Sequence, residues 1–85
     1  MVRPVRILLF ATARTVVGRA DLEWTVPATG VPARALAAQL AAAYPKLGPT
    51  LRVSRLLRNG RPLEGRNPRV RPGDEFAVHP PYGGG

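Results

Sequence analysis

The segment from Val2 to Ala11 has the period-two pattern of a β-strand, with apolar residues on both faces. Val5, Ile7 and Leu9 share one face. Only Arg6 interrupts the apolar residues of the other face. Strands that are apolar on both faces are typically covered on both sides, so the pattern predicts a central strand buried on both faces.

A second alternating segment, Asp21–Val26, has only one apolar face. Leu22 and Trp24 point to the same side as the final valine, and acidic residues and a threonine point to the other. This pattern predicts a half-buried strand, and with the first strand it predicts an N-terminal hairpin. We interpret Thr12–Gly18 as a connection that closes at Gly18.

The alanine-rich segment Ala33–Tyr44 predicts the main helix, because alanine has the highest helix propensity. Pro32 is placed as a first-turn proline, and Pro45 ends the segment. Leu36 and Leu40 lie at helical spacing among alanines and form a narrow apolar stripe. We therefore expect this helix to lie close against a sheet.

The second half of the chain contains a predicted hairpin. We interpret Lys46–Thr50 as a loop and Leu51–Arg58 as a strand. Asn59-Gly60 follows, and this dipeptide is a strong signal for a two-residue turn between antiparallel strands. The return strand, Arg61–Leu63, contains Pro62, which predicts an edge position because proline cannot donate a backbone hydrogen bond.

The last predicted strand, Phe76–His79, follows a turn at Pro72-Gly73 and ends before Pro80-Pro81. The order of elements predicts an α+β fold, with one main helix packed across a mixed sheet of about five strands. A right-handed crossover through the helix places the first and last strands side by side. This arrangement is the β-grasp, or ubiquitin-like, fold. We expect the core to contain Phe10, Trp24, Leu36, Leu40, Phe76 and Val78.

Size and composition exclude several classes of protein. A chain of 85 residues forms one small domain with little interior for an enclosed catalytic chamber. Without cysteine there is no disulfide, Cys-ligated metal or thiol nucleophile, and a single histidine cannot build a His-rich zinc site; we expect no metal. The apolar run Ile7–Ala11 is far shorter than the about 20 residues that span a membrane, so we expect a cytoplasmic protein without a membrane partner.

Basic residues exceed acidic ones by 13 to 5, which gives a net charge of +8. The densest stretch, from Arg52 to Arg71, carries seven arginines against Glu64 alone. It contains no aromatic residue on which a base could stack. The pattern favours a solvated or protein-facing basic surface over a nucleic-acid groove. A nucleic-acid-binding module is the weaker alternative.

The C-terminal segment carries the most specific feature. After Pro80-Pro81 the chain ends on Gly83-Gly84-Gly85, and we expect a domain over residues 1–81 followed by a flexible glycine-rich tail over residues 82–85. A tail without side chains is thin enough for a narrow channel. From Pro80 to Gly85 it could extend roughly 20 Å, which could carry the terminal carboxylate into another protein's active site.

The chain resembles the MoaD/ThiS sulfur-carrier family, most closely the branch of the molybdopterin synthase small subunit. The most specific part is a Gly-Asp-Glu turn, an apolar strand, Pro-Pro, two variable residues and Gly-Gly. Here Tyr82 and Gly83 fill the variable places. The resemblance covers essentially the whole chain, through the segments Arg6–Arg14 with Gly18, Asn59-Gly60, Pro72–Val78 and His79–Gly85.

The resemblance implies a sulfur carrier that is not an enzyme on its own. An E1-like partner would adenylate the Gly85 carboxylate with ATP, and a sulfur-donating protein would convert it to a thiocarboxylate. The large molybdopterin synthase subunit would then receive the tail and pass the sulfur to a pterin precursor. No cofactor would be bound permanently. Gly83 and Gly84 would thread the tail, and the partner contacts would be His79, Pro80, Pro81 and Tyr82.

Other functions share the same tail. The chain could serve thiamin, cysteine or tRNA thiolation, or be a ubiquitin-like modifier that is attached to lysines.

His79 departs from the family, which usually has an apolar residue there; we interpret it as a partly exposed edge histidine, with a partner-contact or proton-transfer role as the alternative. Arg14 matches an arginine of the family's first loop, with a structural or an interface role. Asp74-Glu75 is interpreted as shaping the turn rather than as an acid pair.

Overall fold

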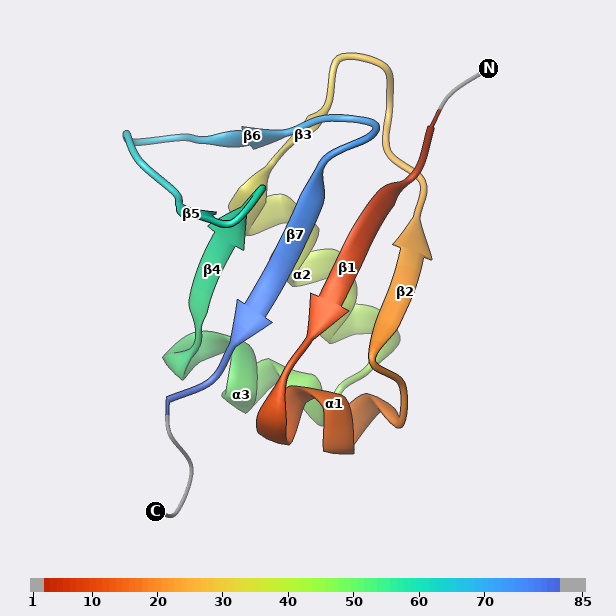
Figure 1. Ribbon diagram of the computed structural model, residues 1–85, viewed down its shortest axis with the longest axis vertical. Helices are drawn as coiled ribbons and strands as arrows, with labels where there is room; N and C mark the ends of the chain where they lie inside the picture. Colours follow the sequence, from red (N-terminus) through yellow and green to blue (C-terminus); the bar gives the residue numbers. More distant parts are fainter. Residues whose placement is uncertain (1–2, 82–85) are drawn as a thin grey trace.

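A five-stranded mixed sheet forms the centre of the computed structural model, which describes residues 3–81 (Figure 1). The strand order across this sheet is β2-β1-β7-β4-β5, and β3 and β6 form a separate two-stranded sheet. The strands are β1 (Val5–Leu9), β2 (Asp21–Trp24), β3 (Val31–Pro32), β4 (Arg55–Arg58), β5 (Arg61–Pro62), β6 (Arg69–Val70) and β7 (Glu75–His79). The helices are α1 (Ala11–Val17), α2 (Ala33–Ala43) and α3 (Leu47–Val53).

The first and last strands lie side by side at the centre of the sheet. β1 and β7 are parallel, with Ile7 opposite Phe76, while β2 and β4 pair antiparallel on their outer sides. Parallel neighbours need a crossover connection, which α2 supplies. The predicted α+β, β-grasp fold is therefore confirmed, including the N-terminal hairpin and the placement of the terminal strands.

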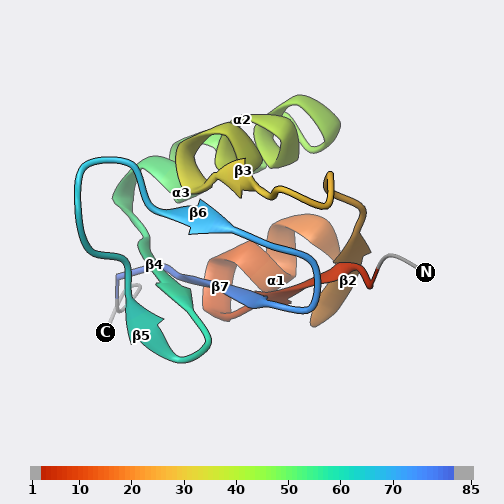
Figure 2. The same cartoon turned by 90° about the horizontal axis from the view of Figure 1, so that it is seen from above.

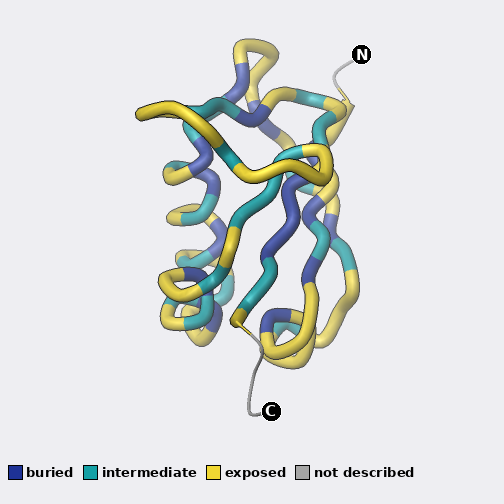
Figure 3. The backbone as a smooth tube through the Cα atoms, turned by 60° about the vertical axis from the view of Figure 1, so that its left-hand side comes forward, coloured by how far each residue is buried: buried dark blue, intermediate teal, exposed yellow. Residues whose placement is uncertain are grey.

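The core lies between one face of the sheet and the helices. Figure 2 shows α2 and α3 on one side of the sheet, and Figure 3 shows the buried stretches gathered between these layers. The predicted core members Leu36, Leu40, Phe76 and Val78 are completely buried. Trp24 packs against this core while its indole Nε1 donates a 2.9 Å hydrogen bond to Oε1 of Gln39.

The prediction that the first strand is buried on both faces is wrong. Val5, Ile7 and Leu9 face the helices and are buried, but Leu8 on the other face is only half-buried. Phe10, expected in the core, is 41% exposed. Among the described residues no helix covers this second face (Figure 2), because α2 and α3 both pack on the first.

Two short helices replace segments that we interpreted as irregular or extended. The connection Thr12–Gly18 is mostly α1, which ends where Gly18 adopts φ 83° and donates its N–H to the carbonyl oxygen of Arg14. The loop Lys46–Thr50 and the start of the strand Leu51–Arg58 are largely α3. Its Gly48-Pro49 dipeptide suggested a loop, but proline is tolerated in the first turn of a helix.

The hairpin turn at Asn59-Gly60 is confirmed. Asn59 and Gly60 have φ values of 51° and 80°, the left-handed conformations that a type I′ turn requires. β5 follows and lies at the edge of the sheet, as the proline within it predicts. The sequence did not reveal the pairing of β3 with β6, because strands of two residues show no periodicity.

None of the helices within residues 3–81 has the length and apolar character needed to cross a membrane.

Candidate functional site

The sheet ends at the base of the C-terminal segment. β7 finishes at His79, and Pro80 and Pro81 continue from it at the end of the sheet where α1 and α3 lie (Figure 1). Pro80 is half-buried and Pro81 is exposed. The predicted tail residues Tyr82, Gly83, Gly84 and Gly85 lie outside the described residues. The site is therefore built from the surface next to Pro80 and Pro81.

The face of the sheet opposite the helices, here called the open face, carries an apolar row. The strand register places Leu8, Ala77, Leu57 and Pro62 next to one another across four strands. Residues opposite one another in paired strands point to the same face. Leu8 and Leu57 are half-buried and Pro62 is exposed, so this part of the row is accessible to solvent.

A second row lies closer to the C-terminal segment. His79 is opposite Arg55 on β4, and its ring stacks on Phe10 with a centroid distance of 4.1 Å and an interplanar angle of 19°. Phe10 directly follows β1, so this stack joins the ends of the two central strands. His79 is half-buried, so it is partly exposed as expected, but it lies on the central strand β7 and is not an edge residue.

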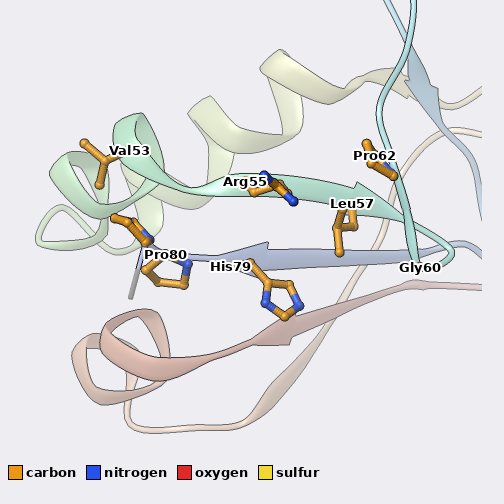
Figure 4. A pocket seen from close by; sticks show the side chains of 8 residues that line it. Val53, Arg55, Leu57, Gly60, Pro62, His79 and Pro80 are labelled. Carbon is orange, nitrogen blue, oxygen red and sulfur yellow. The ribbon is translucent and has the colours of Figure 1, made fainter. Parts of the chain in front are cut away.

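A groove of about 570 Å³ runs along β4 and the end of β7. Val53, Arg55 and Leu57 line one side, and His79 and Pro80 line the other (Figure 4). Val53 is 63% exposed. The exposed large apolar side chains of the described chain are Phe10, Val16 and Val53, and all three lie in or beside α1 and α3 at this end of the molecule.

Acidic residues occupy the opposite part of the open face. Glu23 and Glu75 flank Arg6 in the strand register, and Asp21 lies opposite Leu8. The Nη2 atom of Arg6 lies 3.0 Å from Oδ2 of Asp21, and its Nη1 atom lies 3.9 Å from Oε2 of Glu75. These are the ion pairs found within residues 3–81. Glu23 and Glu75 therefore lie away from Pro80-Pro81 and Asp21 lies beside the apolar row, while Arg55 lines the groove next to Pro80-Pro81.

The arginine-rich stretch is not one patch. Arg58 points to the helix side and donates a 2.6 Å hydrogen bond to the carbonyl oxygen of Arg69. Arg69 in turn donates to the carbonyl oxygens of Thr29 and Gly30, at 3.3 and 2.9 Å. These two arginines hold the loop before β3 against β6, a structural use that sequence reasoning missed because the partners are backbone atoms far away in the chain.

Asp74 and Glu75 diverge, as the interpretation of a turn-shaping pair expected. Asp74 accepts a 2.8 Å hydrogen bond from the backbone N–H of Arg71 and a 3.1 Å bond from Nδ2 of Asn59. Glu75 faces the open side instead. Within residues 3–81, no group of three or more His, Asp or Glu side chains is arranged to hold a metal ion.

The chain matches one known protein family over most of its length. The sequence model described as the ThiS family matches residues 7–85. A search of individually curated protein sequences gives no significant match.

Several solved structures resemble this chain. The HVO 2177 protein of Haloferax volcanii has 29% identity and a TM-score of 0.77, and the match covers 98% of this chain and 87% of that one. SAMP1 from Haloferax volcanii has 26% identity and a TM-score of 0.77, with 96% and 99% covered. A putative molybdopterin converting factor, subunit 1, from Pyrococcus furiosus has 22% identity and a TM-score of 0.79, with 93% and 98% covered.

Proposed function

The chain belongs to the ThiS family, and on this premise we propose that it is a cytoplasmic sulfur carrier that holds the sulfur atom on the carboxyl group of Gly85. The observation that carries the proposal is the position of the C-terminal segment. The central strand β7 passes into Pro80-Pro81 beside an apolar groove. The family match extends from there to Gly85.

The proposed chemistry belongs to partner proteins. An E1-like enzyme binds ATP, and a carboxylate oxygen of Gly85 attacks the α-phosphate and releases pyrophosphate. The terminal sulfur of a persulfide on a second partner then attacks the carbonyl carbon, and AMP leaves with the oxygen. The product is an acyl disulfide. A partner thiol then attacks the sulfur on the partner's side, so that a disulfide forms between the partner sulfurs and the thiocarboxylate leaves as a nucleophile that the chain can carry without a cysteine. The chain itself supplies the reacting carboxyl group and the surface that presents it.

Within this chemistry, we favour the molybdopterin branch over thiamin, cysteine or tRNA thiolation. The Pro80-Pro81 pair before the tail supports this choice. The fold shared with the Pyrococcus furiosus molybdopterin converting factor subunit is compatible with it. The receiving partner would be a large molybdopterin synthase subunit that accepts the tail and passes the sulfur to a pterin precursor.

The test is the intact mass of the chain. Incubation with an E1-like enzyme from the same organism, ATP and a sulfur donor should exchange one oxygen atom for sulfur in the full chain. A variant that lacks Gly85 should show no exchange, while Arg34→Gln, which changes an exposed residue of α2, should react like the original chain. Absence of the sulfur-containing species in the full chain would exclude the carrier function.

A ubiquitin-like modifier is the second candidate, and the likeness to SAMP1 proteins, described as small archaeal modifier proteins, favours it. In this function, the Gly85 carbonyl would form an amide with a lysine amine of another protein. The chain has a single lysine, the exposed Lys46 between α2 and α3, so lysine-linked chains of copies could grow only there. Conjugates on other proteins, together with copy-to-copy links that Lys46→Arg removes, would identify a modifier.

A further inference from the structure

The open face separates its charges along the direction of the strands. Glu23 and Glu75 flank Arg6 at the end far from the C-terminal segment, and Asp21 lies beside Leu8, where it pairs with Arg6 at 3.0 Å. At the near end the charged side chain is Arg55, next to His79. Among residues 3–81, the carboxylate nearest to this end in the strand register is that of Asp21, and Arg6 already neutralises it.

A third basic group borders the same region. Arg14 of α1 lines a hollow of about 320 Å³ next to the groove, together with Leu8, Phe10 and the ion-paired Arg6 and Asp21. Phe10 lines this hollow while its stacked partner His79 lines the groove, so the aromatic pair forms a wall between the two. Neither Arg14 nor Arg55 makes an ion pair or a side-chain hydrogen bond within the described part of the chain.

We propose that this near end of the open face, formed by Arg14, Arg55, Phe10 and His79 and called here the docking end, binds a partner segment in which carboxylates flank an aliphatic or aromatic side chain. The apolar side chain would cover the exposed ring of Phe10 and enter the groove beside it. The carboxylates would pair with the two guanidinium groups. Identifying this partner as the activating or receiving protein rests on the proposed function.

Charge complementarity favours an acidic protein segment over a nucleic acid. A phosphate backbone could pair with the same arginines, but along the open face it would meet Asp21, Glu23 and Glu75. It would also desolvate charged phosphates against the apolar row. A short acidic segment ends before Glu23 and Glu75 are reached, and the carboxylate of Asp21 is already paired with Arg6. The apolar side chain of the segment gains from burial. Opposite charges at such a contact set orientation and partner choice.

The test titrates a synthetic peptide, in which two glutamates flank a leucine and a phenylalanine, into the full ¹⁵N-labelled chain and follows the amide signals. We expect shifts in residues 8–14, 53–57 and 77–81, and weaker binding of the matched peptide that carries glutamines. Arg55→Gln should weaken binding about three- to fivefold, as expected for a solvent-accessible charge pair. Arg55→Lys should retain most of the affinity.

The matched control is Arg34→Gln, which removes an exposed arginine from α2 on the other side of the sheet. It lowers the net charge equally and should leave binding unchanged. The proposal is overturned if the glutamine peptide binds as tightly as the glutamate peptide. Equal losses of affinity in Arg55→Gln and Arg34→Gln would also overturn it. So would tighter binding of oligothymidylate than of the glutamate peptide at the same salt concentration. The titration needs neither ATP nor Gly85, so a failed sulfur exchange leaves it intact.

Discussion

Gly30 illustrates how a single residue depends on a distant part of the chain. Its φ is 80°, and a Cβ atom at this position would lie 2.6 Å from the carbonyl oxygen of Val70. The guanidinium of Arg69 donates hydrogen bonds to the carbonyl oxygens of Thr29 and Gly30 and so holds the loop in place. Both the backbone conformation and the close approach of β6 therefore require glycine.

We expect Gly30→Ala to lower the free energy of unfolding by about 2–4 kcal/mol, because the left-handed conformation and the backbone clash both oppose a side chain. Gly18→Ala is the matched control. Gly18 has φ 83° but no atom within 4 Å of the would-be Cβ, so the cost should be only about 1 kcal/mol. Urea denaturation followed by circular dichroism measures both. Equal losses of unfolding free energy in the two variants would show that the clash with Val70 adds no cost at Gly30.

Asn59 shows the limit of local sequence signals. The Asn-Gly dipeptide predicted the turn correctly, because the backbone preference is local. It did not predict that the asparagine Oδ1 accepts the backbone N–H of Glu75 at 2.8 Å, or that Nδ2 donates to Asp74. These contacts join residues 15 and 16 positions apart, so they exist only once β4 pairs with β7.

At the scale of elements, β1 has two apolar faces, and only one of them is buried. Its period-two pattern identified the strand, but both faces looked equally suited to burial. The helices cover only the face that carries Ile7, so Leu8 and the following Phe10 are left for the open face. The site therefore uses an apolar surface that sequence reasoning had assigned to the core.

Two phenylalanines, Phe76 in β7 and Phe10 directly after β1, test this difference. Phe76→Ala should lower the free energy of unfolding by about 3–5 kcal/mol, because its side chain is fully buried. Phe10→Ala should cost about 1 kcal/mol, because the ring is partly exposed and its main contact is the stack on His79. Thermal unfolding of the two variants checks the contrast. A loss for Phe10→Ala as large as that for Phe76→Ala would place Phe10 in the core after all.

The short helices show why propensity alone misses elements. Leu47 and Leu51 of α3 are four residues apart and both buried, which is a helical spacing. The intervening Gly48-Pro49 hid this spacing, and a helix of this length depends mainly on packing against its neighbours. α3 packs against both α1 and α2, a condition that no local pattern can reveal.

On the scale of the whole molecule, positively charged side chains far outnumber negatively charged ones. The chain has a net charge of +8, and its ion pairs within residues 3–81 all involve the exposed side chain of Arg6. Exposed pairs of this kind contribute little to stability. Repulsion among the remaining arginines therefore outweighs attraction, and salt should screen mainly repulsion.

We therefore expect the free energy of unfolding to rise by about 1 kcal/mol or less as sodium chloride increases from about 10 mM to about 150 mM. Arg34→Gln, which removes one exposed positive charge, should reduce this rise. Urea denaturation at the two salt concentrations gives the measurement. A decrease in stability with salt would mean that the pairs of Arg6 with Asp21 and Glu75 dominate.

The sequence by itself determined the main strands and helix, their order and the β-grasp fold, because period-two alternation, alanine content and the Asn-Gly turn act over a few residues. The role of Pro80-Pro81 and of the glycines after them stays a prediction from the sequence. Only the tertiary structure decided which face of β1 stays open, that Phe10 stacks on His79, and that Arg58 and Arg69 hold a loop. The reason is that these features depend on where the helices pack and on strands from opposite ends of the chain.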